Sequence, residues 1–285
     1  MTAARILVID GNVREIRARQ IAALGYDSGN GYARVLRRID SALQVDIATA
    51  ADGDGSFPPG VALSDYDGVT MTGSALNIYN GGAPVQRQIE LAQAVFAAGV
   101  PFFGSCWGLQ VAVTAANGEV RANPRGREFG FARRILLSDA GREHRLFAGK
   151  PVVFEAPTVH RDEVASLPAR TQILAANDYG VQAVSFDHGR GSFWGVQYHP
   201  EYDYLDIAAV AERYGQTLID EGIFRDAPAL AAFAAELRAL QTHPADAPLL
   251  WRHGLGPAMQ METLRLLEIR NWLDAAVRPR AQRHQ

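Results

Sequence analysis

The chain has 285 residues, of which 48% are hydrophobic and 21% charged, and its formal net charge is −3. This length can enclose a sizeable core as one large or two modest domains, and the slightly acidic balance gives a nucleic-acid partner no electrostatic support. No apolar run is long enough to span a bilayer, and a single cysteine excludes an internal disulfide and any multi-cysteine metal site. We therefore expect a cytoplasmic protein with no membrane segment and no metal or other cofactor.

The N-terminal half alternates short apolar runs with helical patterns. The apolar, strand-like runs occupy residues 5–10, 45–50, 66–74 and 100–104. The helical patterns occupy residues 11–24, 84–99 and 107–118. A further helical pattern lies within residues 28–39, after a glycine-rich loop. Continuous apolar strands that alternate with helices are typical of a parallel sheet covered on both faces.

After about residue 126 the pattern changes to strand-like segments joined by short links. These segments occupy residues 129–137, 150–159, 171–178, 181–186 and 192–199. Short links predict antiparallel pairing in this part of the sheet. Residues 205–222, 227–243 and 261–277 carry helical periodicity without strand signals, and the basic segment 278–285 is typical of a frayed terminus.

The cysteine lies at the junction of a predicted strand and a predicted helix. Its setting is Gly104-Ser105-Cys106-Trp107-Gly108, the layout of a nucleophile elbow, in which small residues let the chain turn sharply. A thiol at the start of a helix is favoured as a thiolate by the helix dipole. The alternative is that Cys106 is a small buried hydrophobic residue, but the flanking glycines favour the nucleophile.

A nucleophilic thiol needs a base, and the base needs a group that orients it. The segment G-V-Q-Y-H-P-E places His199 and Glu201 two residues apart, with Pro200 restricting the backbone between them. Most histidines elsewhere in the chain lack such a setting. His160 is the exception and is considered below.

The motifs G-S-C-W-G-L-Q and G-V-Q-Y-H-P-E, in this order, resemble those of the class I glutamine amidotransferases. The segment R-E-F-G-F-A-R-R-I at 127–135 is similar to the glutaminase domain of the GMP synthases within that family. The resemblance covers about residues 5–203. It implies a flavodoxin-like, doubly wound α/β fold with a mostly parallel sheet and antiparallel additions. Residues 1–204 would form the amidotransferase domain and residues 205–285 a helical C-terminal extension packed on it.

The resemblance also implies roles for individual residues. Cys106 would attack a γ-glutamyl amide carbonyl to form a thioester, His199 would take and return the proton, and Glu201 would orient His199. The oxyanion hole would be formed at Gly73, Ser74 and Trp107, although the family has a glycine where this chain has Ser74. The substrate-binding candidates are Gln110, His160, Arg161 and Asp162, of which Arg161 replaces a family glycine.

Two enzyme functions and one function of another class remain open. The chain contains no phosphate-binding P-loop and no ATP-using synthetase domain of the kind joined to the glutaminase in GMP synthases. The first hypothesis is a free-standing hydrolase of γ-glutamyl amides, and the insertion at 77–88 favours it because it provides a wall for a larger leaving group. The second is a glutaminase subunit that supplies ammonia to a separate synthetase partner. The third is a non-catalytic binding module. The identity of the amine and the existence of a homodimer are not determined by the sequence.

Overall fold

The computed structural model describes residues 3–53 and 58–283. The strands are β1 (Arg5–Ile9), β2 (Gln44–Ala48), β3 (Gly68–Met71), β4 (Phe102–Ser105), β5 (Glu119–Ala122), β6 (Glu128–Leu137), β7 (Val153–His160), β8 (Asp162–Ser166), β9 (Gln172–Asn177), β10 (Gly180–His188) and β11 (Gly191–Val196). The helices are α1 (Arg14–Leu24), α2 (Ser28–Ile39), α3 (Ala83–Ala98), α4 (Trp107–Ala115), α5 (Asp139–Glu143), α6 (Tyr204–Asp220), α7 (Ala227–Thr242), α8 (Ala247–His253), α9 (Pro257–Gln260), α10 (Glu262–Arg265), α11 (Leu267–Trp272) and α12 (Arg278–Arg283). A π-helical turn, η4 (Leu273–Val277), joins α11 to α12.

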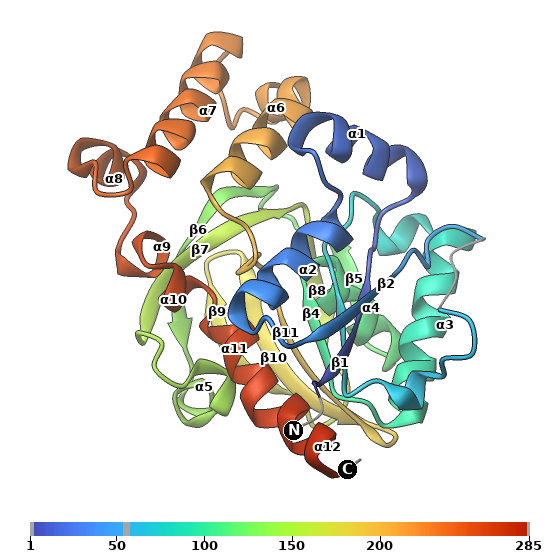
Figure 1. Ribbon diagram of the computed structural model, residues 1–285. Coiled ribbons are helices and arrows are strands. Elements are labelled where there is room, and N and C mark those ends of the chain that lie inside the picture. The colour runs from blue at the N-terminus through green and yellow to red at the C-terminus, as the bar shows by residue number, and fades with distance from the viewer. Residues whose placement is uncertain (1–2, 54–57, 284–285) are drawn as a thin grey trace.

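A mixed sheet forms the centre of the molecule (Figure 1). Within the described residues it has nine strands, in the order β2-β1-β3-β4-β11-β10-β9-β6-β7. The strands from β2 to β11 in this order run parallel to one another. The pairings of β10, β9, β6 and β7 are antiparallel. This arrangement confirms the predicted doubly wound α/β fold with antiparallel additions.

Helices cover both faces of the parallel strands. On one face, α2 and the segment α11–η4 pack on a core that includes Ile6, Phe103 and Trp272. On the other face, α3 and α4 pack on a core that includes Leu7 and Phe102. Successive strand residues point to opposite faces, so the apolar runs that fill both cores are the continuous ones expected of a buried parallel sheet.

The helix α2 begins earlier than the sequence predicts. Residues 28–31 read as a glycine-rich loop, but the whole of Ser28–Ile39 is helical. The side chain of Asp27 accepts a hydrogen bond from the backbone N–H of Asn30 at 2.8 Å and caps the helix. This cap and the packing of Tyr32 and Leu36 in the core outweigh the low helix propensity of Gly29 and Gly31.

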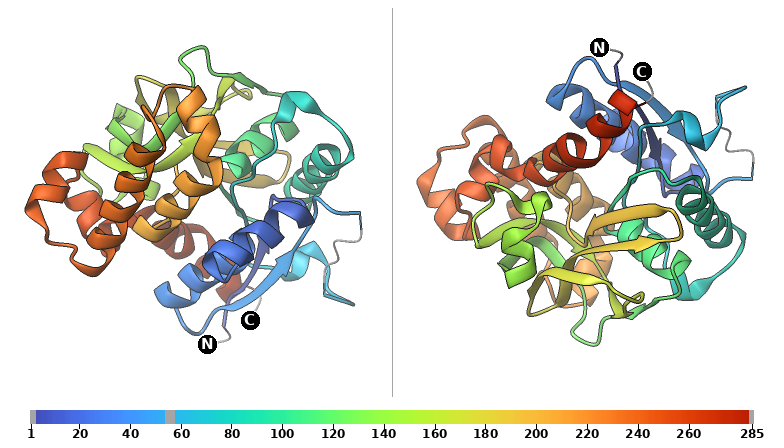
Figure 2. Two further views of the ribbon diagram at one scale, coloured as in Figure 1. Left: turned by 90° about the horizontal axis from the view of Figure 1, so that it is seen from above. Right: turned by 90° about the horizontal axis from the view of Figure 1, so that it is seen from below.

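The C-terminal segment shares its core with the sheet. The helices α6 and α7 pack with Phe131 in a third apolar cluster, and α7 and α8 lie at the periphery beside the antiparallel strands (Figures 1 and 2). The helical pattern predicted at 261–277 is divided among α10, α11 and η4. The predicted frayed terminus is wrong for residues 278–283, because they form α12 and Arg280 donates hydrogen bonds to the carbonyl oxygens of Tyr66 and Gly99.

A buried ion pair fixes α11 to the body of the molecule. Lys150 Nζ and Glu268 lie 2.9 Å apart, and their side chains are 1% and 0% exposed. The hydroxyl of Tyr198, at the end of β11, donates to Glu268 Oε1 at 2.5 Å. None of the helices in the described ranges is long and apolar enough to cross a membrane.

We expect Glu268→Ala to lower the free energy of unfolding by about 3–5 kcal/mol, because it leaves the ammonium of Lys150 buried without a counter-ion. Urea denaturation measures the change. The double variant Lys150→Met/Glu268→Leu should recover most of the loss. The control is Asp178→Ala, which breaks the solvent-exposed pair with Arg134 and should change stability by less than about 1 kcal/mol. A Glu268→Ala protein as stable as this control would contradict the prediction.

Candidate active site

The backbone turns sharply at Cys106, between β4 and α4. Cys106 has φ 52° and ψ −102°, a conformation that costs free energy for a residue with a side chain. Its backbone N–H donates to the carbonyl oxygen of Val196 at 2.8 Å, which fixes the turn to the end of β11. A side chain at Gly104 would collide with the backbone of Gly108, and one at Gly108 with the carbonyl oxygen of Met71. The predicted elbow is therefore present, and both glycines are sterically required.

His199 and Glu201 follow β11 and lie beside this turn. His199 Nδ1 is 2.8 Å from Glu201 Oε1, and both side chains are buried. The ring of Tyr202 stacks on the imidazole at a centroid distance of 4.0 Å and an interplanar angle of 8°. The backbone N–H of His199 donates to the carbonyl oxygen of Pro157 at 2.8 Å. The imidazole is thus held at one nitrogen, along one face and through its backbone.

The other ring nitrogen of His199 is available for proton transfer. Nε2 is buried and has no hydrogen-bond partner in the described part of the chain, while the thiol of Cys106 donates to the carbonyl oxygen of Val159 at 3.6 Å. Burial disfavours the imidazolium, but the charges of Glu201 and then Cys106 outweigh it and raise the pKa of His199 to about 10. An imidazolium beside a cysteine sulfur favours the thiolate form that a nucleophile requires.

The turn that follows β3 lies against the imidazole. A side chain at Gly73 would collide with His199 Cε1, so this close approach requires glycine. Asn12, in the segment that follows β1, fixes this turn. Its Nδ2 donates to the carbonyl oxygen of Gly73 at 3.3 Å, and its Oδ1 accepts from the backbone N–H of Ala75 at 3.0 Å. Ser74 avoids positive φ, so the replacement of the family glycine imposes no left-handed strain.

The backbone N–H groups of the three residues predicted for the oxyanion hole are free. Within the described residues, the N–H groups of Gly73, Ser74 and Trp107 have no acceptor, as expected for an oxyanion hole before substrate binds. The indole of Trp107 is buried and donates to Gln88 Oε1 at 2.8 Å, so its side chain is structural. Asn12 was not predicted as a site residue. The feature that indicated its role was its position just after the first strand, at the carboxyl edge of the parallel sheet.

A cavity of about 220 Å³, which we call the Cys106 cavity, opens beside Cys106. Its wall is formed by Ser74, Ala75, Leu76, Asn77, Tyr79, Cys106, Gln110, Arg127, Val159, His160, Arg161, Asp162 and Tyr214. It therefore brings together all four predicted substrate-binding residues. The insertion contributes here too, because Asn77 Nδ2 and the Tyr79 hydroxyl donate to the carboxylate of Asp162 at 2.8 and 2.9 Å.

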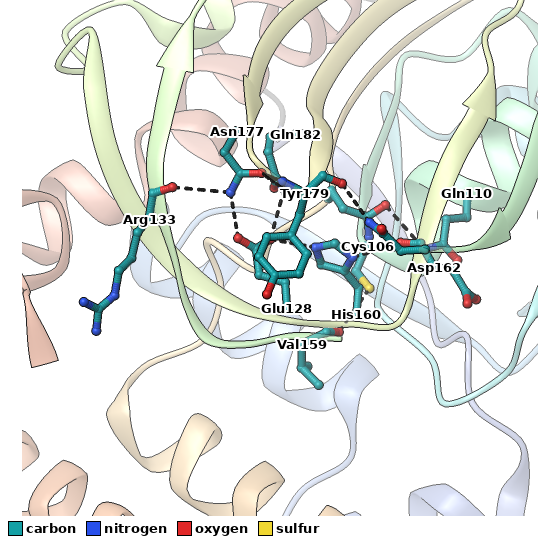
Figure 3. Close-up of polar contacts among 12 residues, drawn as sticks. Cys106, Gln110, Glu128, Arg133, Val159, His160, Asp162, Asn177, Tyr179 and Gln182 are labelled. Carbon is teal, nitrogen blue, oxygen red and sulfur yellow. Dashed lines mark hydrogen bonds and ion pairs between the residues drawn. The ribbon is translucent and has the colours of Figure 1, made fainter. Parts of the chain in front are cut away.

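His160 belongs to a buried hydrogen-bond network behind this cavity (Figure 3). Its Nε2 is 2.8 Å from Glu128 Oε2, and its Nδ1 is 2.9 Å from the carbonyl oxygen of Asp162. Asn177 Nδ2 and Gln182 Nε2 also donate to Glu128. Both ring nitrogens of His160 are therefore engaged within the protein. A contact of His160 with substrate stays a prediction, and the observed contacts give it a positioning role.

Two guanidinium groups line the Cys106 cavity. Arg161, predicted from the sequence, donates from Nη1 to the carbonyl oxygen of Asn123 at 2.6 Å. Arg127, which the prediction missed, is only 11% exposed and donates from Nε and Nη2 to Glu221 beyond the end of α6. Its guanidinium also lies 5.0 Å from the ring centroid of Tyr214. The signal was present in the R-E-F-G-F segment, but only the tertiary structure brings Arg127 to the site.

A second and much smaller cavity of about 20 Å³, which we call the His199 cavity, shares Ser74, Ala75, Val159 and Tyr214 with the first. Its wall is formed by Asn12, Gln20, Ser28, Gly73, Ser74, Ala75, Val159, His199, Tyr202, Arg213 and Tyr214. Tyr214 lines both cavities, whereas Cys106 lines the first and His199 the second. The helix α6 provides both Arg213 and Tyr214, just before its backbone departs from helical geometry at Gly215.

Comparison with known proteins gives consistent results. Residues 27–205 match the family described as glutamine amidotransferase class-I. The chain is 35% identical to a γ-glutamyl-L-1-hydroxyisopropylamide hydrolase of Pseudomonas sp., over 99% of this chain and 96% of that protein. It is 32% identical to a glutamine-hydrolysing GMP synthase of Leifsonia xyli subsp. xyli, over 63% of this chain but 31% of that protein.

Among solved structures, a glutamine amidotransferase from Thermotoga maritima matches with a TM-score of 0.63 and 18% identity, covering 97% of this chain and 99% of that one. At this identity the match concerns the fold alone, which it supports over nearly the whole chain, including the C-terminal helices. The family match and the full-length relative establish the relationship: the chain belongs to the class I glutamine amidotransferase family.

Proposed function

We propose that the chain hydrolyses the amide bond between the γ-carboxyl group of glutamate and a small amine. The observation that carries this proposal is a pair of unequal cavities, one lined by Cys106 and the other by His199, whose walls share Ser74, Ala75, Val159 and Tyr214. The larger cavity suits a glutamyl group and the smaller one a compact leaving amine. The full-length similarity to a γ-glutamyl amide hydrolase, which includes the segment that forms α6, supports this function.

The charges around the Cys106 cavity complement the two charged groups of a γ-glutamyl substrate. The guanidinium groups of Arg127 and Arg161 would attract its α-carboxylate, and the carboxylate of Asp162 would attract its α-ammonium group. Gln110 is buried in the same wall and has an amide to offer the glutamyl chain. These contacts fix the distance from the charged end of the substrate to the γ-carbonyl, which must lie over the sulfur.

Acylation then follows from the positions of Cys106 and His199. The thiolate attacks the γ-carbonyl carbon and forms a C–S bond, and the N–H groups of Ser74 and Trp107 donate to the oxyanion. His199, protonated at Nε2 and oriented by Glu201, gives its proton to the amide nitrogen. The C–N bond breaks, the neutral amine leaves from the His199 side, and a γ-glutamyl thioester remains on Cys106.

Deacylation uses the same groups in reverse. Neutral His199 removes a proton from a water molecule that enters the space left by the amine. The resulting hydroxide attacks the thioester carbonyl, the oxyanion is again bound by Ser74 and Trp107, and the C–S bond breaks. Glutamate is released, and the thiolate–imidazolium pair is regenerated.

A second candidate is a glutaminase subunit that passes ammonia to a separate synthetase. The similarity to part of a GMP synthase favours this candidate. Arg213 and Tyr214 of α6, however, cover the side from which ammonia would leave, which favours a complete hydrolase. A non-catalytic binding module is disfavoured because the thiol, imidazole and carboxylate lie together in catalytic order.

The purified chain should hydrolyse γ-glutamyl ethylamide faster than glutamine, because the His199 cavity accommodates an amine substituent that ammonia lacks. Glutamate release, measured without any second protein, tests this expectation. The α-linked glutamyl ethylamide is the control and should be inert, since its charged groups cannot reach the same contacts. If the chain releases glutamate from no γ-glutamyl amide until a synthetase is added, the function as a glutaminase subunit is correct instead.

Glu201→Gln should move the alkaline limb of kcat/KM to lower pH. The limb reports the loss of the His199 proton, which the pKa of about 10 places in the alkaline range. Since the charge of Glu201 raises this pKa, removing the charge lowers it, and activity fails at a lower pH. The control is Glu119→Gln, on the exposed surface of β5. An unchanged alkaline limb in Glu201→Gln would show that Glu201 does not set the protonation of the base.

Arg127→Met should lower kcat/KM about ten- to a hundredfold for every γ-glutamyl amide, whatever the amine. This is the effect of losing one hydrogen bond to a charged group, about 1.5–3 kcal/mol. Wild type should show a similar loss when the substrate α-carboxylate is converted to a carboxamide, and the variant should show no additional loss. The control is Arg121→Met, whose side chain is 64% exposed on β5. Separate, additive losses in the variant would assign the α-carboxylate to Arg161.

A further inference from the structure

The position of His199 determines where the substituent of the leaving amine must lie; this step rests on the proposed function. The ring that protonates the amide nitrogen lines the His199 cavity and is absent from the wall of the Cys106 cavity. The group attached to that nitrogen therefore enters the His199 cavity. A volume of about 20 Å³ accommodates about one water-sized group. An adjoining cavity of about 70 Å³ shares Gln20, Ser28, Tyr202 and Arg213 with it and provides space for an alkyl branch.

The guanidinium of Arg213 in this wall has no ion-pair partner among the residues that the structure describes. Arg213 is partly buried on α6, and its contact in the described residues is with the ring of Tyr214, at 5.3 Å from the centroid. The wall of the His199 cavity contains no carboxylate among the described residues. Glu201, Asp203 and Asp206 line the adjoining cavity instead. One oxygen of Glu201 bonds His199 and the other has no hydrogen-bond partner, while Asp203 and Asp206 bond backbone N–H groups around the start of α6. The cation is thus available to a ligand.

A second donor in the same wall is Ser28. Its hydroxyl oxygen accepts from Gln20 Nε2 at 2.9 Å and from Asn12 Nδ2 at 3.2 Å. Both of these interactions use the oxygen as an acceptor, and the Ser28 O–H itself has no acceptor among the residues described. The His199 cavity therefore offers two free donors, Arg213 and Ser28, to whatever enters it.

We propose that the His199 cavity selects amines that carry a hydrogen-bond-accepting oxygen close to the nitrogen, and that Arg213 is the residue that imposes this selection. A hydroxyl or a carboxylate on the adjacent carbon supplies such an oxygen. An alkyl group occupies the space but leaves the donors unpaired, so its amide is cleaved more slowly than an oxygen-bearing counterpart. An ammonium group is repelled by the guanidinium. The substrate class is therefore the γ-glutamyl amides of amino alcohols or amino acids, and diamines are excluded.

Four substrates whose amines share a branched carbon on the nitrogen test this proposal. They are the γ-glutamyl amides of 2-aminopropan-1-ol, alanine, isopropylamine and 1,2-diaminopropane, the last linked through its internal nitrogen. For wild type, kcat/KM for the better of the two oxygen-bearing amides should exceed that for the isopropylamide at least about tenfold, the effect of one charged hydrogen bond. The diamine conjugate should be the poorest. Whichever of the hydroxyl and carboxylate substrates is preferred identifies the natural source of the oxygen.

In Arg213→Met, the ratio of kcat/KM between the oxygen-bearing amide and the isopropylamide should fall at least about tenfold, and the penalty for the diamine should shrink. Arg213→Lys keeps the charge and should retain the discrimination against the diamine. The control is Arg225→Met, whose side chain is 84% exposed just beyond α6 and which should keep all four rates. Ser28→Ala is a less clean variant, because it also removes the acceptor of Asn12 and Gln20.

The possible outcomes separate this proposal from the proposed function. Equal wild-type rates for all four amides would overturn the selection but leave the hydrolase function intact. If Arg213→Met lowers kcat/KM by the same factor for every substrate, the role of Arg213 is structural, and this outcome would also overturn the selection. Failure to cleave any of the four amides would overturn the hydrolase function, and the selection with it.

Discussion

The strained backbone at Cys106 is the constraint on which the rest of the site depends. Such a conformation costs about 1–3 kcal/mol and persists because β4, β11 and α4 hold the turn from three sides. The order β3-β4-β11 in the sheet then places the neighbours of the thiol. The strand on one side, β3, leads into the Gly73–Ser74 turn, and the strand on the other, β11, leads to His199 three residues after its end. The sheet alone thus brings together the proposed nucleophile, oxyanion donors and base.

The C-terminal segment completes what the sheet begins. Glu268 of α11 accepts a hydrogen bond from Tyr198, the residue directly before His199, so a buried charge pair far along the chain supports the segment after β11 that carries the proposed base. The helix α6 adds Arg213 and Tyr214 to the cavity walls, and Glu221 beyond it orients Arg127. A boundary at residue 204 stays a prediction, but the residues after it contribute to both the core and the site.

The parts of the site that were predictable from sequence are those encoded locally. Gly104–Gly108 and His199–Glu201 each lie within a few residues, so strand, turn and orienting partner can be read together. Asn12, Arg127 and Arg213 were not predictable, because their roles arise where distant segments meet. The docking of residues 278–283 has the same cause: Arg280 finds its acceptors, the carbonyl oxygens of Tyr66 and Gly99, only in the folded chain. The start of α2 was missed because tertiary packing outweighed local propensity.

The two cavities also differ in how their charges are held, and this difference divides recognition of the substrate. Arg127 is fixed by Glu221 and Tyr214 before any ligand arrives, so little ordering cost remains when a carboxylate binds it. Such a rigid site suits the glutamyl group, which is the same in every substrate. Arg213 contacts the ring of Tyr214 but has no carboxylate partner among the described residues, so under the proposed function its contribution would depend on what the amine provides. Under the proposed function, a change at Arg213 of α6 would therefore alter the choice of amine without disturbing the strained turn at Cys106 or the imidazole of His199.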